Sequence, residues 1–465
     1  MKSNMARIML AAPASGSGKT MLTCGLLAAF KKRQLHIAAM KCGPDYIDPM
    51  FHRKVLGICT GNLDSYFMSE DDLINCLVKK AIENDITIVE GVMGYYDGLG
   101  GATTQASAYE IARVTKTAAI LIVDCKGASV TLAAMIKGMI DFRSDSNIAG
   151  VILNRITEGF YEKIKPVIEH ECGVPVVGYV PILKDMEVPS RHLGLYAPEE
   201  MEAFGAWANR LAEIFEKTID LDRILAFADA AEALVRNEKP VQKETKTNPE
   251  NLPTIAVARD EAFAFYYDEN MELLKKLGAK LIEFSPLRDR ELPSDVDGLV
   301  LGGGYPELYA KMLSENVGMR TSIHEKCMNG LPCIAECGGF LYLQKSLEGD
   351  DKTVYPMCDV LHGEGFRTTR LQRFGYMEAR IDTDGMIGKH TILKGHEFHY
   401  WDCTQNGADA TAYKPTSPDK QYKCIVHTDT MFAGFPHFNY YSNPEALRGF
   451  VRACSKYKQY KERTI

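Results

Sequence analysis

The sequence predicts an α/β protein with two domains joined by a linker. Short apolar runs alternate with longer helical patterns from the N-terminus onward, and the alternation starts again near residue 253. Between the two series, residues 237–252 are charged, carry two prolines and contain almost no apolar side chains. Such a segment is typical of an exposed linker. We therefore expect domains at 1–236 and 253–465, a division that the length of 465 residues supports.

The expected strands are short, and several are continuously apolar, which is typical of strands buried on both faces of a parallel sheet. Helical patterns between them, such as 19–33 and 104–115, complete β-α-β units. In the first domain the expected strands are 6–12, 37–41, 86–90, 119–124, 148–154 and 174–180. In the second domain they are 254–258, 280–284, 298–301 and 333–335.

Composition and charge exclude several function classes. The chain is 46% hydrophobic and 25% charged, as in ordinary globular proteins, and its net charge of −7 argues against binding to nucleic acid or an anionic membrane. No apolar run reaches the length of a membrane span, and the N-terminus lacks a signal-peptide pattern. Thirteen scattered cysteines without a Cys-x-x-Cys pair indicate reduced thiols and a cytoplasmic protein.

A phosphate-binding loop follows the first strand. Residues 13–20 read Pro-Ala-Ser-Gly-Ser-Gly-Lys-Thr and precede a helical pattern, which is the context of a P-loop. Its glycines let backbone N–H groups face phosphate oxygens, and the helix N-terminus favours the anion. Pro13 replaces the usual first glycine, and the alternative is an ordinary turn before a helix. The residues expected to bind ATP are Gly16, Ser17, Gly18, Lys19, Thr20 and Lys41.

Acidic side chains follow several expected strands of the first domain. Because ligands bind at the carboxyl ends of parallel strands, these side chains are candidates for metal or substrate binding. The alternative for each aspartate is turn formation beside proline or glycine. The expected Mg²⁺ ligands are Thr20, Asp48 and Glu90. The expected substrate-site residues are Asp45, Tyr46 and Asp97.

A cysteine at a tight turn is the strongest functional signal in the second domain. An apolar strand ends at Glu336, and Cys337 is followed by two glycines and a helical stretch, 340–345. A thiol there is expected to be exposed, with a helix N-terminus that favours the thiolate, and thus to act as a nucleophile. The alternative is a buried core cysteine. Backbone N–H groups of Gly303, Gly304 and Gly338 are the expected oxyanion donors.

A cysteine nucleophile also needs an imidazole as its base. Spacing alone leaves the choice open among His396, His399, His427 and His437. The pair His396-x-x-His399 also suggests metal binding, although two ligands without a third are weak evidence.

Together these motifs resemble one family over nearly the whole chain. The sequence resembles the cobyrinic acid a,c-diamide synthases, glutamine-hydrolysing carbon–nitrogen ligases of cobalamin synthesis. The resemblance implies a dethiobiotin-synthetase-like P-loop domain followed by a class I glutamine amidotransferase domain. The segments that carry it are 12–20, 41–49, 62–64, 90–98, 191–195, 262–270, 302–307 and 395–400.

The resemblance implies the chemistry of both sites. Cys337 would attack the side-chain amide of glutamine, giving a glutamyl thioester and ammonia. ATP with Mg²⁺ would phosphorylate the a and c carboxylates of cobyrinate in turn, and ammonia would displace phosphate. The family's catalytic histidine falls on His437. Related enzymes orient this imidazole with a histidine or glutamate two residues later, where this chain has Asn439, so the third member of the triad stays open, with His399 and His427 as further candidates.

Two other functions remain open at this stage. The closest alternative is the same amidation on hydrogenobyrinate or nickel sirohydrochlorin, since relatives of the family act on these tetrapyrroles. The second is a P-loop scaffold or partitioning ATPase with a degenerate glutaminase domain. Such ATPases carry an extra lysine near the start of the loop, where this chain has Pro13 and Ala14. A homodimer is favoured by analogy of fold only.

Overall fold

The computed structural model describes residues 2, 3, 5–183, 198–237 and 251–464 and divides the chain into two compact units, 1–238 and 239–465. Segment 191–195 and most of the expected linker lie outside the described residues. Within the described part of the chain, no helix has the length and apolar character needed to cross a membrane.

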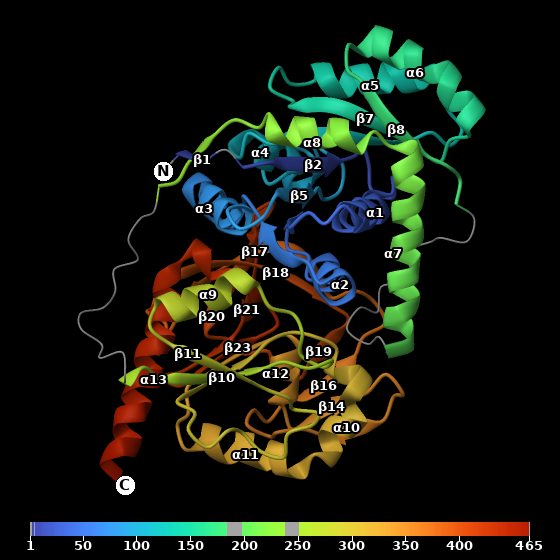
Figure 1. The fold of residues 1–465 in the computed structure, drawn as a ribbon. Coiled ribbons are helices and arrows are strands. Elements are labelled where there is room, and N and C mark those ends of the chain that lie inside the picture. Colours follow the sequence, from blue (N-terminus) through green and yellow to red (C-terminus); the bar gives the residue numbers. More distant parts are fainter. Residues whose placement is uncertain (1, 4, 184–197, 238–250, 465) are drawn as a thin grey trace. The chain divides into compact units, whose positions relative to one another are not determined.

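The first unit is built on a seven-stranded parallel sheet of order β4-β3-β5-β2-β6-β7-β8. Figure 1 labels four of its strands, β2, β5, β7 and β8. Continuous burial explains the sheet, because every residue of β2, β3 and β5 is buried. The strands are β2 (Arg7–Ala11), β3 (Ile37–Cys42), β4 (Cys59–Leu63), β5 (Ile86–Glu90), β6 (Ala118–Asp124), β7 (Ile148–Asn154) and β8 (Val176–Val180). A short pair, β1 (Lys2–Ser3) and β9 (Leu234–Val235), lies apart from it.

Three helices of the first unit supply most of the helical residues in the apolar cluster that they share with the sheet: α1 (Lys19–Lys32), α7 (Pro198–Thr218) and α8 (Leu221–Asp229). Phe30 and Phe215 are fully buried there beside strand residues such as Ile88 and Ile122. The other helices are α2 (Ile47–Leu56), α3 (Glu70–Ala81), α4 (Ala108–Val114), α5 (Thr131–Asp141) and α6 (Glu158–Cys172).

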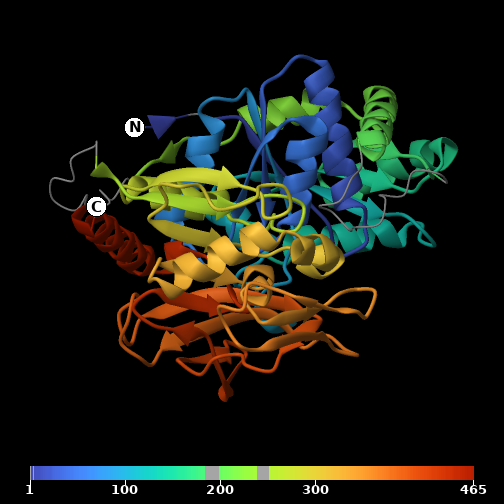
Figure 2. The ribbon, with the colours of Figure 1, turned by 90° about the horizontal axis from the view of Figure 1, so that it is seen from below.

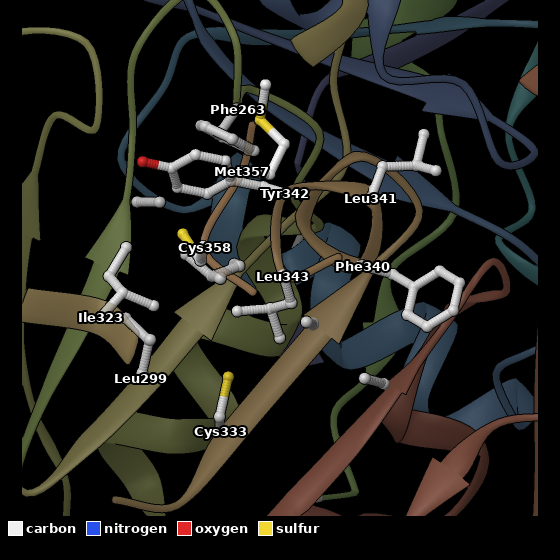
Figure 3. Packing of buried hydrophobic residues seen from close by; sticks show 14 of the residues in the cluster. Phe263, Leu299, Ile323, Cys333, Phe340, Leu341, Tyr342, Leu343, Met357 and Cys358 are labelled. Carbon is white, nitrogen blue, oxygen red and sulfur yellow. The ribbon is translucent and has the colours of Figure 1, made fainter. Parts of the chain in front are cut away.

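The second unit has a central sheet of order β11-β10-β12-β13-β23-β22, parallel except for β22. Figure 3 shows the apolar packing on one face, where Phe340, Tyr342 and Leu343 lie with Leu299 and Cys333 of the strands. Its strands are β10 (Thr254–Ala258), β11 (Lys280–Phe284), β12 (Gly298–Leu301), β13 (Cys333–Glu336), β22 (Val426–His427) and β23 (Met431–Gly434). The helices are α9 (Asp268–Lys276), α10 (Ala310–Glu315), α11 (Val317–Met328), α12 (Gly338–Tyr342) and α13 (Pro444–Thr464).

Two further sheets belong to this unit, and their orange and red strands form a separate layer in Figure 2. The five-stranded antiparallel sheet, order β21-β20-β17-β18-β24, packs in one apolar cluster with residues of the central sheet such as Val257 and Phe432. Its strands are β17 (Arg373–Ile381), β18 (Ile392–His399), β20 (Ala410–Lys414), β21 (Ser417–Cys424) and β24 (His437–Phe438). The four-stranded sheet contains β14 (Ser346–Glu348), β15 (Val354–Pro356), β16 (Glu364–Arg367) and β19 (Trp401–Cys403).

The two-domain α/β architecture predicted from the sequence is confirmed, and two helix boundaries are corrected. The helix expected at 104–115 begins only at Ala108, because the Ser107 hydroxyl caps it by accepting the Glu110 N–H at 3.2 Å. The helix expected at 340–345 is α12, Gly338–Tyr342, so it starts directly after Cys337.

Candidate active sites

The phosphate-binding loop connects β2 to α1 and is held from the end of β7. Gly16 and Gly18 have φ angles of 78° and 96°, which favour glycine. A Cβ on Gly18 would lie 2.5 Å from the Asn154 amide nitrogen, which itself donates to the Ser17 carbonyl at 2.9 Å. Arg155 donates to the Gly16 carbonyl. Residues at the end of a later strand therefore fix the backbone of this loop.

Lys19 begins α1 and turns back over the loop. Its ammonium donates to the Ala14 carbonyl at 3.3 Å and to the Met93 carbonyl. Burial, helped by the nearby Lys41 ammonium, lowers the pKa of Lys19 to about 8. The cation is therefore poorly hydrated and held at the mouth of the loop, as phosphate binding requires.

A cluster of buried charges lies beside the loop, at the ends of β3 and β5. The Lys41 ammonium is 2.5 Å from Asp48 Oδ2, 2.7 Å from Glu90 Oε1 and 3.7 Å from Asp45 Oδ2. The Thr20 hydroxyl donates to Glu90 Oε1 at 2.8 Å and contacts Asp48 Oδ2 at 3.4 Å. The structure therefore brings together Thr20, Lys41, Asp48 and Glu90.

Neighbouring charges set the protonation of this cluster. Burial raises the pKa of Glu90 to about 7, although the Lys41 ammonium opposes the shift. Burial also acts to raise the pKa of Asp48, but the Lys41 ammonium outweighs this effect, and the pKa falls below its usual range. The carboxylates in turn hold the pKa of Lys41 well above its ordinary value despite burial. One hydroxyl and two carboxylates are hard oxygen donors of the kind that Mg²⁺ takes, so the residues fit this ion.

Three expected substrate residues lie on loops around this cluster. Asp45 Oδ1 accepts the N–H groups of Ile47 and Asp48 at 2.8 and 3.3 Å, so it shapes the start of α2 as well as facing Lys41. Tyr46 is buried immediately before α2. Asp97 Oδ2 accepts the Gly94 N–H at 2.9 Å within the loop that follows β5.

One buried histidine of this cluster was not singled out from the sequence. His52, on α2, has its Nε2 3.9 Å from Glu90 Oε2, and burial lowers its pKa to about 4. A histidine within a helical pattern carries no local signal, so this contact becomes visible only through the fold.

Cys337 lies at a strained turn between β13 and α12. Its φ and ψ angles are 48° and −102°, a region that residues with a side chain rarely adopt. The Cys337 N–H donates to the Gly434 carbonyl at 2.8 Å, and a Cβ on Gly339 would lie 2.2 Å from the Leu301 carbonyl oxygen. The strand-turn-helix arrangement of a nucleophile elbow is therefore present.

Two expectations about this thiol were wrong. Cys337 is only 9% exposed, and burial raises the pKa of its thiol, an effect that nearby Glu307 adds to. Helix α12 has five residues, too few to offset burial. The resting group is therefore a thiol, and a role as nucleophile would require a base that takes its proton.

The glycines expected to bind an oxyanion lie close to the expected histidine. A Cβ on Gly303 would lie 2.2 Å from Cε1 of His437, so the imidazole packs against the Gly303 backbone. A Cβ on Gly338 would lie 3.1 Å from the Gly304 nitrogen, and one on Gly304 would lie 2.0 Å from the Ala262 carbonyl oxygen. The absence of side chains at Gly303, Gly304 and Gly338 thus permits their close approach to one another and to His437.

His437 is 3% exposed and belongs to β24, which pairs with β18. Its ring stacks on that of His396, with centroids 5.1 Å apart and planes at 18°. Burial lowers the pKa of His437 well below its usual range, and the neighbouring histidines add to this effect. Its Nδ1 lies 3.9 Å from Oε2 of Glu336, the residue before Cys337.

The other candidate histidines have structural contacts. Both ring nitrogens of His427 are used, one by the Thr383 hydroxyl at 3.0 Å and the other by the Ile387 N–H at 3.0 Å. His399 Nδ1 bonds the Trp401 carbonyl at 2.6 Å. Among the described residues, no group of three or more His, Cys, Asp and Glu side chains has the geometry of a metal site. The suggestion of a metal at His396 and His399 therefore gains no support.

The second unit also contains a polar cavity of about 140 Å³. It is lined by Phe435, which follows the Gly434 carbonyl that accepts the Cys337 N–H, and by His399, whose ring stacks on Phe435 at 4.1 Å. Cations and carboxylates face the same space. Its charged side chains are Arg373, Lys423, Glu397 and Asp402.

Comparison with known proteins agrees with this geometry in both units. Residues 8–195 match the CobQ/CobB/MinD/ParA nucleotide binding domain, and residues 254–445 match the CobB/CobQ-like glutamine amidotransferase domain. Three similar proteins are named cobyrinate a,c-diamide synthase. That of Priestia megaterium is 37% identical over 97% of this chain and 98% of the relative. Those of Listeria innocua and Caldanaerobacter subterraneus are 39% and 38% identical, over 95% and 97% of this chain and 98% of each relative.

The fold and its two sites thus define a glutamine amidotransferase with a nucleotide-binding domain. Within this class, identity extends over nearly the full length of the relatives. The chain belongs to the cobyrinate a,c-diamide synthase family.

Proposed function

We propose that this chain amidates the a and c carboxylates of cobyrinate with ammonia from glutamine, at the expense of ATP. The observation that carries the proposal is 37–39% identity to cobyrinate a,c-diamide synthases over almost their whole length. The presence of a phosphate loop and a cysteine elbow in one chain supports it, because the reaction needs both an activated carboxylate and a source of ammonia.

At the thiol site, His437 takes the proton of Cys337 as the sulfur attacks the glutamine side-chain carbonyl. The negative charge that develops on the amide oxygen is stabilised by backbone N–H groups of Gly303, Gly304 and Gly338. Collapse of this intermediate breaks the carbon–nitrogen bond and releases ammonia, with the proton returned by His437. Water then hydrolyses the glutamyl thioester to glutamate and regenerates the thiol.

The charged cavity beside Phe435 suits the amino-acid end of glutamine. This end is zwitterionic, and the cavity offers cations and carboxylates together. Arg373 lies over the Tyr422 ring at 3.5 Å, and the Tyr422 hydroxyl donates to Glu397, so these charges are held in place. We assign the α-carboxylate to the Arg373 side of the cavity and the α-ammonium to Glu397.

At the phosphate site, backbone N–H groups of the loop and Lys19 bind the ATP phosphates. Lys41 offsets the charge that develops on the phosphoryl group as it moves to a substrate carboxylate. Thr20, Asp48 and Glu90 would hold Mg²⁺, which supplies charge neutralisation when bound. Asp45, Tyr46 and Asp97 are assigned to the rim that contacts the tetrapyrrole carboxylate. Ammonia attacks the resulting acyl phosphate, forming the amide and releasing phosphate.

The test is the mass of the product. With ATP, Mg²⁺ and glutamine, cobyrinate is expected to give a diamide. Turnover of hydrogenobyrinate or nickel sirohydrochlorin, with none of cobyrinate, would contradict the substrate assignment while leaving the reaction class intact.

Replacement of Cys337 separates the two half-reactions. Cys337→Ala is expected to abolish diamide formation from glutamine but to retain it with added ammonium salt, because the phosphate site is unchanged. Mass spectrometry of the product with each nitrogen source measures both. Full glutamine-dependent turnover by this variant would exclude Cys337 as the nucleophile.

A further inference from the structure

The orientation of His437 requires a group on its Nδ1 side. An imidazole that takes a thiol proton through Nε2 must present the correct tautomer, and a partner at Nδ1 usually fixes it. Asn439 stands where related enzymes carry such a group, and the sequence left its role open. Its Oδ1 instead accepts the Tyr441 N–H at 3.1 Å, and its Nδ2 has no hydrogen-bond partner among the described residues. Asn439 therefore shapes the turn after β24 and does not orient the histidine.

We infer that Glu336 is the positioning residue of His437, with the inference resting on the proposed glutamine hydrolysis. Glu336 Oε2 lies 3.9 Å from His437 Nδ1, close enough for an electrostatic interaction and longer than a direct hydrogen bond. Glu336 ends β13 and Cys337 follows it directly, so one short segment places both the nucleophile and the group that faces its base.

The carboxylate is itself held by the segment that carries the histidine. Glu336 Oε1 accepts the Tyr440 hydroxyl at 3.0 Å and the Phe438 N–H at 3.4 Å. These two bonds engage one oxygen and leave the other directed toward Nδ1. The same contacts tie β24 to the end of β13, so the histidine and the elbow cannot shift independently.

The interaction between Glu336 and His437 matters during proton transfer. When the Cys337 proton moves to Nε2, a positive charge appears on a fully buried ring, and the carboxylate at Nδ1 offsets it. Burial raises the pKa of Glu336 to about 8 and lowers that of His437, so each group is near neutral until the other gains charge. Glu336 thus favours the imidazolium only as it forms.

Replacement of Glu336 in the full chain tests the inference. Glu336→Gln keeps the size of the side chain but loses the charge, and it is expected to lower glutamine-dependent kcat about a hundredfold. The KM for glutamine and ammonia-dependent diamide formation are expected to stay unchanged. In the unmodified chain, kcat/KM for glutamine is expected to rise as Glu336 loses its proton near its pKa of about 8. This rise is expected to be absent in Glu336→Gln, whereas a merely structural role of Glu336 would not produce it.

Two further variants make the result decisive. Asn439→Ser retains an oxygen for the turn and is expected to keep glutamine-dependent kcat near that of the unmodified chain. Tyr440→Phe removes the hydroxyl that holds Oε1 and is expected to lower kcat about tenfold. Full kcat in Glu336→Gln, or its loss in Asn439→Ser instead, would overturn the inference. If Glu336→Gln fails to fold, unchanged kcat in Tyr440→Phe overturns it equally. An unmodified chain that leaves glutamine intact would overturn the proposed function itself.

Discussion

The two lysines of the phosphate site hold their protons with different strength. Carboxylates surround Lys41 and keep it charged, whereas Lys19 bonds backbone carbonyls and has another cation nearby. Burial therefore lowers the pKa of Lys19 from its ordinary 10.5 to about 8. A folded-state pKa below the unfolded value means that protonated Lys19 costs folding free energy at neutral pH and that this cost disappears as pH rises above 8.

ATP affinity is expected to fall as pH rises through the pKa of Lys19. Phosphate oxygens stabilise the protonated lysine, so binding takes up a proton once the free lysine has lost it. Calorimetric titrations with ATP from about pH 7.5 to about pH 9.5 measure the effect. Lys19→Arg, which stays charged throughout, serves as the control and should show no such decline. An affinity that is independent of pH in the unmodified chain would contradict the assignment of Lys19 to the phosphates.

At the scale of elements, close packing between α1 and α7 depends on a single glycine. A Cβ on Gly25 would lie 2.3 Å from the ring of Phe215, which is fully buried in the cluster of the first unit. Helix α5 offers a contrast, since a Cβ on Gly138 would have nothing within 4 Å.

These two helical glycines predict opposite effects on stability. Gly25→Val is expected to destabilise the first unit by about 1–3 kcal/mol through overpacking. Gly138→Ala is expected to stabilise it by about 0.5–1 kcal/mol, because alanine loses less backbone entropy in a helix. Urea unfolding followed by circular dichroism gives both values. Equal effects of the two substitutions would show that Phe215 moves aside without cost.

Strands buried on both faces were predictable because each is a continuous apolar run that can be recognised in the sequence. Residues 86–90, 148–154 and 254–258 were predicted with the bounds that the structure gives. Strand β21, by contrast, is mostly exposed and reads Ser-Pro-Asp-Lys-Gln-Tyr-Lys-Cys, so nothing in its sequence indicated a strand. Its pairing with β20 comes from the hairpin and from the layer beneath it.

Within the candidate sites, too, local sequence motifs were predictable and contacts between distant segments were not. The phosphate loop and the cysteine elbow are continuous motifs, and the structure places both in their expected contexts. The contact of Glu336 with His437 joins segments far apart in the sequence, so spacing could not reveal it. Burial of the Cys337 thiol was likewise missed, because it results from the layers packed around the turn.

At the scale of the molecule, each unit has apolar clusters made of its own residues. The residues of the phosphate site lie between 13 and 155, and those of the thiol site lie beyond 262.

Separate fragments are expected to fold. Fragments 1–238 and 239–465 should each show a cooperative thermal transition by circular dichroism, since each retains its clusters. The first is also expected to bind ATP, as measured by calorimetry, with its Lys19→Met form as the control. Absence of a transition in either fragment would mean that its core needs the other part of the chain.

Burial of Cys337 also bears on how the chain responds to oxidants. All thirteen cysteines lie in the described residues, and Cys59 alone is exposed. Peroxides and alkylating agents react with accessible thiolates, so they modify Cys59, at the edge of the first unit's sheet, before Cys337. Titration of the free thiols in an ageing preparation is therefore expected to report modification of Cys59 first, and loss of reactive thiol is expected to precede loss of glutamine turnover.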